Sequence, residues 1–244
     1  MLLTESHRGG SNPPLTANSC MKVCLLLSGN MRNADEVFPL FKSNLLDRYD
    51  TDVFISTWNS HNVYDSINLF NPISVDVENY EAGFQSKWES LVSHNEHKLE
   101  TNANLVSMIS MWYKTLRVNQ LRTKYENLMG FRYDLIIKTR PDIRIEEPIE
   151  LIESSNLSIP YGWDWSEGTN DLIAWGNQYN MNAYCELFYH FVSLTNSMDK
   201  INPERMLKEY LRIKNIKVDR PELDLTLRDM NIKTTYWFSN QNTI

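Results

Sequence analysis

Three short apolar runs in the first third of the chain have the length and composition of buried β-strands. They are KVCLLLSG at residues 22–29, TDVFISTW at residues 51–58 and ISVDVEN at residues 73–79. Short apolar runs that end in polar residues are typical of buried parallel strands. Between the first two runs, residues 34–49 carry apolar residues at helical spacing, with Asn33 as the expected N-cap. Strand, helix and strand at this spacing predict an α/β unit with parallel strands.

The rest of the chain continues this alternation of helical and strand-like segments. A broad apolar stripe predicts a long helix over residues 104–128, followed directly by a strand over residues 133–147. The later elements are expected to be a strand at 171–176, a helix near 181–194, a helix from Pro203 with Asn202 as its cap, and a strand at 233–238. This order predicts a single α/β domain over residues 21–244, with a mostly parallel central sheet flanked by helices.

The first twenty residues differ from the rest of the chain. They have no hydrophobic period and are rich in Gly, Pro, Ser and Asn, so we expect a disordered extension. Met21 directly precedes the first strand, and GGSNPP at residues 9–14 is the peptide that the T-arm of a tRNA gene would encode. We therefore expect Met21 to be the natural start and residues 1–20 to be upstream sequence read through.

Composition and charge narrow the function classes. With 244 residues, 42% of them hydrophobic, the chain can bury a core large enough for an enzyme. Its formal charge of -7 argues against nucleic acid as the main partner, because phosphate backbones are bound by basic surfaces. Cys20, Cys24 and Cys185 form neither an even disulfide framework nor a CxxC pattern, which favours a reducing, cytoplasmic compartment. No apolar run approaches the roughly 18 residues that cross a bilayer, so no transmembrane segment is expected.

Charged residues occupy alternate positions in the strand that follows the long helix. In YDLIIKTRPDIRIEE, residues 133–147, the charged residues Lys138, Arg140, Asp142 and Arg144 would share one face of a continuous strand. That face either is exposed to water, as charge alternation usually indicates, or belongs to a binding site.

Polar segments also follow two of the earlier strands. In an open α/β sheet, ligands bind outside the carboxyl ends of the strands, at a switch in strand order. SGNMRN follows the first strand, STWN ends the second and KTRPD ends the fourth. Ser28 and Gly29 allow a phosphate or sugar to approach backbone amides, and Arg32 precedes a helix N-terminus, where it can bind a phosphate. The alternative is a glycine turn with a surface arginine.

Asp142 is the candidate metal ligand. A carboxylate at a strand end, between Arg140 and Arg144, suits a site that holds Mg²⁺ or Mn²⁺ together with a diphosphate. Lys138 and Arg140 would then neutralise the remaining phosphate charge. The alternative is a half-exposed edge strand held by salt bridges, and Pro141 fits both interpretations because proline marks the edge or end of a strand.

A second acidic cluster lies at residues 162–176, where acids alternate with tryptophans. The acids are Asp164, Glu167 and Asp171, and the tryptophans are Trp163, Trp165 and Trp175. Carboxylates beside exposed indoles suit a carbohydrate site, because apolar sugar faces stack on aromatic rings while sugar hydroxyls bind acids. Asp171 is the candidate general base, or a residue that supports a metal ligand. The alternative is a loop fixed by buried tryptophans, with its acids exposed to water.

Other catalytic motifs are missing from the sequence. It contains no GxGxxG, no Walker lysine loop, no GxSxG elbow and no HExxH. His94 and His97 have nearly the spacing of a helical metal pair, but no third ligand lies nearby in the sequence, so we do not expect a metal there.

Six segments taken together resemble a known type of protein. LLLSGNMR, TDVFISTW, MISMWYKTLRVNQL, YDLIIKTRPDIRI, NDLIAWG and PERMLKEYL resemble, in that order, the uncharacterised glycosyltransferase-like proteins of capsule, lipopolysaccharide and large-virus or phage gene sets. The resemblance implies a Rossmann-like GT-A fold that binds a nucleotide-diphosphate sugar and coordinates a divalent metal through an Asp-x-Asp motif. Here the matching position is Arg140-Pro141-Asp142, so Arg140 replaces the first acid and can perform part of the metal's role at the leaving group.

The same resemblance implies roles for further residues. Ser28, Gly29 and Arg32 would lie at the nucleotide, Lys114 would face the phosphates, and Asp171 and Glu204 would border the acceptor or sugar pocket. The resulting prediction is a glycosyltransferase, of the hexosyl-transferring kind, that uses a nucleotide sugar and a glycan or other hydroxyl acceptor. Its catalytic residues would be Asp142, Arg140 and Asp171. The alternatives are a non-catalytic glycan- or partner-binding module with a degenerate transferase fold, and a phosphate-ester hydrolase.

Overall fold

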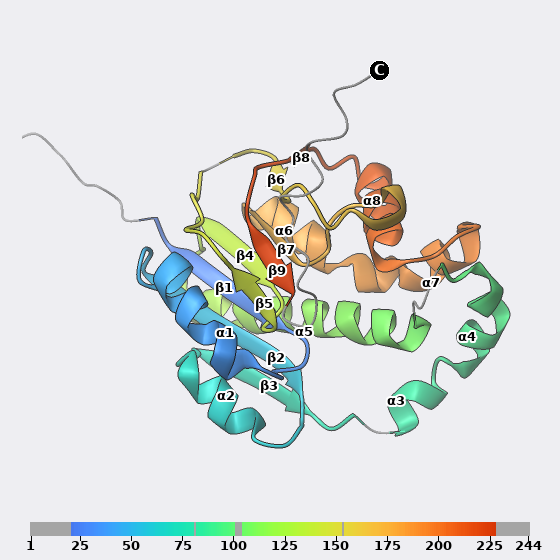
Figure 1. The fold of residues 1–244 in the computed structure, drawn as a ribbon, viewed down its shortest axis with the longest axis horizontal. Helices are drawn as coiled ribbons and strands as arrows, with labels where there is room; N and C mark the ends of the chain where they lie inside the picture. Colours follow the sequence, from blue (N-terminus) through green and yellow to red (C-terminus); the bar gives the residue numbers. More distant parts are fainter. Residues whose placement is uncertain (1–20, 81, 101–103, 153, 228–244) are drawn as a thin grey trace, which may run out of the picture.

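The computed structural model describes residues 21–80, 82–100, 104–152 and 154–227. These residues form an α/β structure in which helices cover both faces of a central sheet (Figure 1). The expectations for residues 1–20, and for a strand at residues 233–238, lie outside the described residues.

The central sheet has seven strands in the order β3-β2-β1-β4-β7-β6-β8. They are β1 (Val23–Ser28), β2 (Thr51–Trp58), β3 (Ser74–Glu78), β4 (Leu135–Thr139), β6 (Leu157–Ser158), β7 (Ile173–Gly176) and β8 (Val218–Asp219). Among these strands of the described chain, only β7 runs opposite to the others, since it pairs antiparallel with both β4 and β6. The predicted mostly parallel sheet is therefore confirmed.

The helices form two layers. They are α1 (Ala34–Phe41), α2 (Val63–Leu69), α3 (Ala82–Ser86), α4 (Glu89–Asn95), α5 (Leu105–Met129), α6 (Gln178–Cys185), α7 (Leu187–Ser197) and α8 (Pro203–Ile213). Apolar residues of α1 and α2 pack against one face of the sheet, and those of α5 to α8 pack against the other. Within the described chain, no helix combines the length and the hydrophobicity needed to span a membrane.

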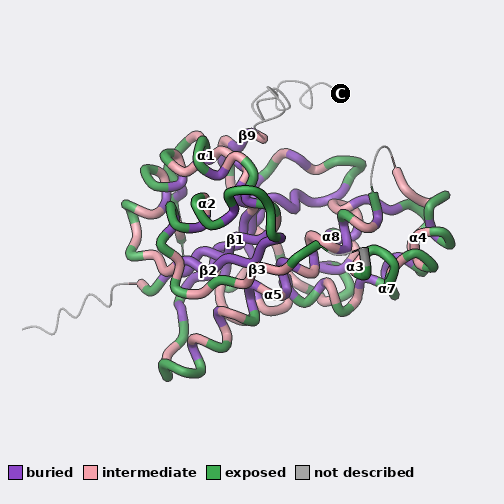
Figure 2. Tube along the Cα trace, turned by 90° about the horizontal axis from the view of Figure 1, so that it is seen from below, coloured by how far each residue is buried: buried purple, intermediate pink, exposed green. Residues whose placement is uncertain are grey.

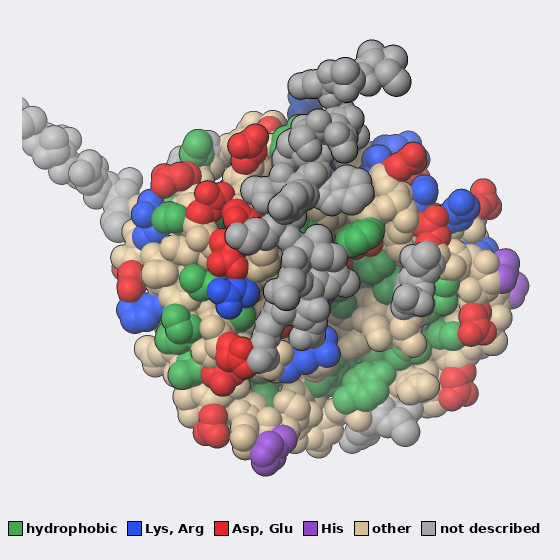
Figure 3. Space-filling model, in the orientation of Figure 1, with side chains coloured by type: hydrophobic (Ala, Val, Ile, Leu, Met, Phe, Trp, Pro, Cys, Tyr) green, Lys and Arg blue, Asp and Glu red, His purple; other side chains and the backbone are tan. Residues whose placement is uncertain are grey.

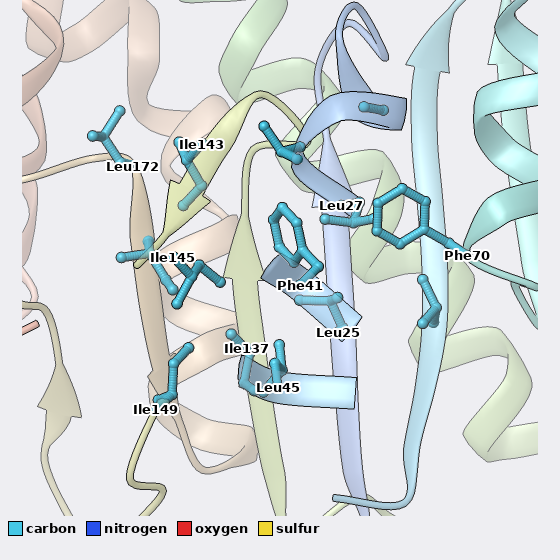
Figure 4. Packing of buried hydrophobic residues seen from close by; sticks show 14 of the residues in the cluster. Leu25, Leu27, Phe41, Leu45, Phe70, Ile137, Ile143, Ile145, Ile149 and Leu172 are labelled. Atoms are coloured by element: carbon cyan, nitrogen blue, oxygen red, sulfur yellow. The ribbon is translucent and has the colours of Figure 1, made fainter. Parts of the chain in front are cut away.

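The continuous apolar run of β1 is explained by burial on both faces. Leu25 and Leu27 pack against α1, where Phe41 lies over them (Figure 4), whereas Cys24 and Leu26 face the layer that contains α5. A strand covered on both faces has no position for a polar side chain, which is why the run lacks alternation. Figure 2 shows this buried zone along the central strands.

The expected cap at Asn202 is confirmed, and Asn104 caps α5 in the same way. The side chain of Asn104 accepts a hydrogen bond from the backbone N–H of Ser107, and Asn202 accepts one from Arg205. Asn33 does precede α1, but it has a φ of 59° and its side chain makes no capping bond. It therefore marks the helix start through its left-handed backbone rather than through its side chain.

The expected continuous strand over residues 133–147 is wrong. β4 ends at Thr139, the chain turns at residues 141–142, and β5 (Ile143–Ile145) pairs with β9 (Leu225–Leu227) in a separate two-stranded sheet. Pro141 cannot donate a hydrogen bond to a neighbouring strand, which favours the break at this position. The four alternating charged residues consequently do not share one face of a strand.

Two predicted helices are also interrupted. The helix after β1 changes at Lys42 into a π-helical turn over Lys42–Leu46. The segment near residues 181–194 consists of α6 and α7, which are separated at Glu186. These breaks shorten the helices, but the segments on both sides of each break stay in the same layer beside the sheet.

Candidate functional site

A cavity of about 720 Å³ opens at the edge of the sheet where β1, β2 and β4 end. The strand order reverses at β1, so the carboxyl ends of β1 and β4 are adjacent there, the arrangement that forms ligand sites in open α/β sheets. Because β7 is antiparallel to β4, with Ile173 opposite Thr139, the amino end of β7 reaches the same edge. The first turns of α5 and α8 complete the cavity. On the described part of the face in Figure 3, acidic and basic side chains are interspersed.

The end of β1 brings backbone close to the cavity. Gly29 has a φ of 119°, a conformation that residues with a Cβ rarely adopt, and its N–H donates to the carbonyl of Ser56 at 3.2 Å. Ser28 also lines the cavity, but its hydroxyl is buried and lies 3.1 Å from the hydroxyl of Thr115. Gly29 thus contributes a tight turn, and the Ser28 hydroxyl already has a partner inside the protein.

Two guanidinium groups and one carboxylate lie on the cavity wall formed by β1 and β4. Arg140 donates two hydrogen bonds to Asp142, from Nε to Oδ1 at 2.8 Å and from Nη2 to Oδ2 at 2.7 Å. Arg32 lies 3.8 Å from the same carboxylate, and its side chain is 62% exposed. Two positive groups share one negative group, so this wall carries a net positive charge that suits an anionic ligand.

The same contacts test the fit of a divalent cation at Asp142. Both carboxylate oxygens already accept hydrogen bonds from Arg140, and a cation at that position would meet the guanidinium charge. In the part of the chain that the structure describes, no three His, Cys, Asp or Glu side chains are grouped so that they could hold a metal ion. The donor set does not fit a protein-held cation with Arg140 in place, and the metal role of Asp142 stays a prediction.

Asp171 and Glu204 form a carboxyl pair in the cavity. Asp171 is 4% exposed, and burial raises its pKa, while the charges of Lys138 and Arg140 oppose the rise. Burial, followed by the charge of Asp171, raises the pKa of Glu204 to about 8. Two interacting carboxyls titrate together, and the one nearer the cations loses its proton first. The cations therefore favour the charged form of Asp171, while Glu204, with a pKa of about 8, holds a proton at neutral pH.

Lys138 and Lys114, both expected at the phosphates, lie outside the cavity lining and are fully buried. The Lys138 Nζ donates to the backbone carbonyl of Asp171 at 3.0 Å, and burial lowers the pKa of Lys138 to about 8. Lys114 forms ion pairs with Glu78 at 2.5 Å and Asp76 at 3.4 Å. The ammonium group of Lys138 thus binds the backbone of Asp171, and the ammonium group of Lys114 is paired with two carboxylates.

The three acids of the cluster at residues 162–176 have different surroundings. Asp164 accepts hydrogen bonds from Arg220 at 2.6 and 2.7 Å and from the backbone N–H of Asn170 at 2.8 Å, so it holds the loop together. Glu167 is exposed and lies outside the cavity lining. Asp171 is the acid of this cluster that lines the cavity among the described residues.

The three tryptophans of this segment also differ. Trp163 and Trp175 are buried and belong to the core, although Trp163 also lines the cavity, whereas Trp165 is 48% exposed and lines it as well. The alternative of a loop fixed by buried tryptophans fits two of the three indoles, but its exposed acids do not fit Asp171, which is buried. Trp165 remains available to a ligand.

The resemblance predicts a role for Lys114 of α5 but not for the first turn of this helix. Asn104 and Ser107 in its first turn line the cavity, as does Tyr80 after β3. The α/β pattern did not indicate that this helix begins beside the ends of β1 and β4. Glu204 was implied only by the resemblance, and its position at the first turn of α8 gives it a chemical role.

Gly168 lies against the backbone of α8, so its substitution tests the packing of the loop before β7 on this helix. A Cβ at Gly168 would lie 2.4 Å from the carbonyl carbon of Glu204, whereas a Cβ at Gly83 in α3 would meet no atom within 4 Å. We expect Gly168→Ala to lower the free energy of unfolding by about 1–3 kcal/mol, because the backbone of α8 must move. Urea denaturation measures the change, and Gly83→Ala is the control that should be neutral or slightly stabilising. Equal stability of the two variants would contradict this packing.

The cavity therefore combines a positively charged wall, a carboxyl pair and an exposed indole at the switch in strand order. These groups suit an anionic ligand next to a hydroxylated one. Comparison of the chain with models of known protein families, and with curated proteins, finds no significant match.

Proposed function

We propose that the chain is a glycosyltransferase that transfers a sugar from a nucleotide-diphosphate sugar to a hydroxyl acceptor. The observation that carries the proposal is the presence, in one cavity at the strand switch, of two guanidinium groups and a carboxyl pair with a raised pKa. A diphosphate leaving group needs positive charge, and an acceptor hydroxyl needs a base. The GT-A type of the fold is part of the same proposal.

The positively charged wall would bind the diphosphate of the donor. Arg32 is exposed and contacts Asp142 only at 3.8 Å, so its other N–H donors can bind a phosphate. Arg140 is held by Asp142, which fixes the direction of its guanidinium. Gly29 allows the diphosphate to approach the turn after β1 closely.

The carboxyl pair would act on the acceptor. In a direct displacement, the acceptor oxygen forms a bond to the anomeric carbon as the bond between that carbon and the diphosphate oxygen breaks. The electron pair leaves with the nucleoside diphosphate, and the hydroxyl proton moves to the Asp171 carboxylate. Glu204, which holds a proton at neutral pH, can donate a hydrogen bond to a neighbouring oxygen of the acceptor.

Calorimetry with uridine, guanosine and cytidine diphosphate sugars, with and without Mn²⁺, tests the proposal. We expect one nucleotide series to bind, and Arg32→Ala to weaken its affinity about tenfold through loss of a charge-assisted contact. Arg48→Ala is the matched control, because Arg48 pairs with Glu150 outside the cavity lining. The Mn²⁺ arm tests the predicted metal role of Asp142 separately.

The main competing function is a binding module without catalysis. The closed ion pair between Arg140 and Asp142, at the position of the Asp-x-Asp motif, favours it. Absence of nucleotide binding under every condition would support the module and contradict the transferase. Nucleotide binding together with release of the nucleoside diphosphate in the presence of an acceptor would exclude it.

A further inference from the structure

The loop before β7 has an unusual backbone. Trp163, Ser166 and Glu167 have φ values of 59°, 51° and 61°, and Gly162 has a φ of 85°. Residues with a Cβ seldom adopt this left-handed conformation, and several within one loop cost conformational energy that the surrounding structure must offset. Such conformations persist where contacts with the surrounding structure hold the backbone in place.

Contacts from two other segments hold this loop in place. The ion pair of Asp164 with Arg220 fixes its first half. In its second half, Lys208 of α8 donates to the carbonyl of Glu167 at 2.7 Å, and the N–H of Thr169 donates to the carbonyl of Glu204 at 3.0 Å. The loop is thereby connected directly to the residue that forms the carboxyl pair.

Two indoles of this loop, Trp163 and Trp165, line the cavity, and Trp165 is the exposed one. Its indole is 48% exposed, and its ring centroid lies 6.5 Å from that of Trp163, which is buried and donates from Nε1 to the carbonyl of Leu225. Trp163 thus anchors the loop, while Trp165 contributes little to the core. A large exposed indole on a fixed loop is preorganised to stack on a ligand, because little side-chain or loop ordering remains to be done on binding.

We propose that Trp165 is the stacking platform for a sugar ring of the acceptor, so that the acceptor of this enzyme is a saccharide. The inference rests on the proposed function. The apolar face of a pyranose matches an indole, and its hydroxyls would bind the carboxyl groups of Asp171 and Glu204, which line the same cavity.

A nucleobase is the other ligand that stacks on indoles, and the charges argue against it here. Asp171 and Glu204 line the same cavity as Trp165, and an ionised Asp171 would repel the phosphates of a nucleotide. The exposed cation Arg32 comes instead from the end of β1. A neutral, hydroxylated ligand therefore fits the wall at Trp165 better than a nucleotide does.

The test compares Trp165→Ala and Trp165→Phe with Tyr179→Ala, which removes a 74% exposed aromatic ring of α6 outside the cavity lining. Glucose-, galactose- and N-acetylglucosamine-terminated oligosaccharides are titrated against the protein in calorimetry, without a donor. We expect one of them to bind the unmodified chain, about tenfold more weakly to Trp165→Ala, with partial recovery in Trp165→Phe. Tyr179→Ala should bind as the unmodified chain does.

Nucleotide-sugar affinity and hydrolysis of the donor by water are measured on the same variants. Both should be unchanged in Trp165→Ala if the indole belongs to the acceptor site. Loss of nucleotide affinity in that variant, unchanged saccharide affinity, or no saccharide binding by the unmodified chain would overturn the inference. Failure of the proposed function looks different: no nucleotide sugar would then bind or react, whatever residue is at position 165.

Discussion

Asp171→Asn is expected to lower the rate of sugar transfer about 10²- to 10⁴-fold without unfolding the protein, the range typical for loss of a general base. The amide has nearly the shape of the carboxylate, so the cavity keeps its form, but it cannot take the acceptor proton. Asp171 is buried at the amino end of β7, beside the buried cation Lys138. In the proposed mechanism, its charge is the part of the side chain that takes the acceptor proton.

Release of nucleoside diphosphate at saturating donor and acceptor measures this effect, and circular dichroism checks the fold. Glu167→Gln is the matched control, because Glu167 lies on the same loop, is exposed and does not line the cavity. Transfer should be unchanged in the control. A fully active Asp171→Asn variant would remove Asp171 from the mechanism.

The same substitution has a second readout that does not depend on activity. The charge of Asp171 contributes to the raised pKa of Glu204, so removing that charge should lower the pKa of Glu204 from its value of about 8. A carboxyl group loses its proton near its pKa. Glu204 should therefore lose its proton at a lower pH in Asp171→Asn than in the unmodified chain. Carbon-13 NMR of the glutamate side chains follows this titration, and an unchanged Glu204 would mean that the two groups are not coupled.

Arg122→Ala is expected to lower the free energy of unfolding by about 3–5 kcal/mol, as is typical when one partner of a buried ion pair is removed. The side chains of Arg122 and Glu126 in α5 are 0% and 1% exposed, with Nη1 of Arg122 donating to Oε2 of Glu126 at 2.7 Å. Arg122 also donates to Gln178 of α6 at 2.8 Å, which joins the two helices. Removal of Arg122 leaves a carboxylate without its cation in the core, where desolvation is costly.

Urea denaturation of the variant measures this loss. Arg212→Ala is the control, because Arg212 forms an exposed pair with Glu209 on α8, and such pairs rarely change stability measurably. A double variant, Arg122→Met with Glu126→Leu, should recover most of the stability, since it removes both charges together. A loss below about 1 kcal/mol in Arg122→Ala would show that Glu126 becomes protonated or solvated without the cation.

Local patterns predicted the elements whose signals are complete within a short segment. TDVFISTW became β2 over all eight of its residues, because its apolar centre and its β-branched and aromatic residues have the composition of a strand. The long helix predicted over residues 104–128 is α5, Leu105–Met129, because its broad apolar stripe lies within the segment itself. In both cases the information lies in neighbouring residues and does not depend on the rest of the fold.

Elements that depend on distant partners were predicted less well. The run at residues 133–147 has strand propensity throughout, yet β5 leaves the main sheet because β9, over eighty positions later, supplies its hydrogen bonds. The charge alternation in this run suggested one binding face, but a turn at residues 141–142 directs Arg140 and Asp142 into the cavity while Lys138 stays buried behind Asp171. A local periodicity cannot show where a strand changes its partner.

The sequence by itself determined the α/β alternation and two of the strand ends, β1 and β2, that border the cavity, because burial and capping impose recognisable local patterns. Only the tertiary structure decided how the candidate acceptor wall is built. The antiparallel direction of β7 brings Asp171 to the edge where the parallel strands end, and the bond from Thr169 to the carbonyl of Glu204 brings α8 to the same place. Strand direction and helix docking follow from long-range hydrogen bonds and packing, which no short segment of the chain contains.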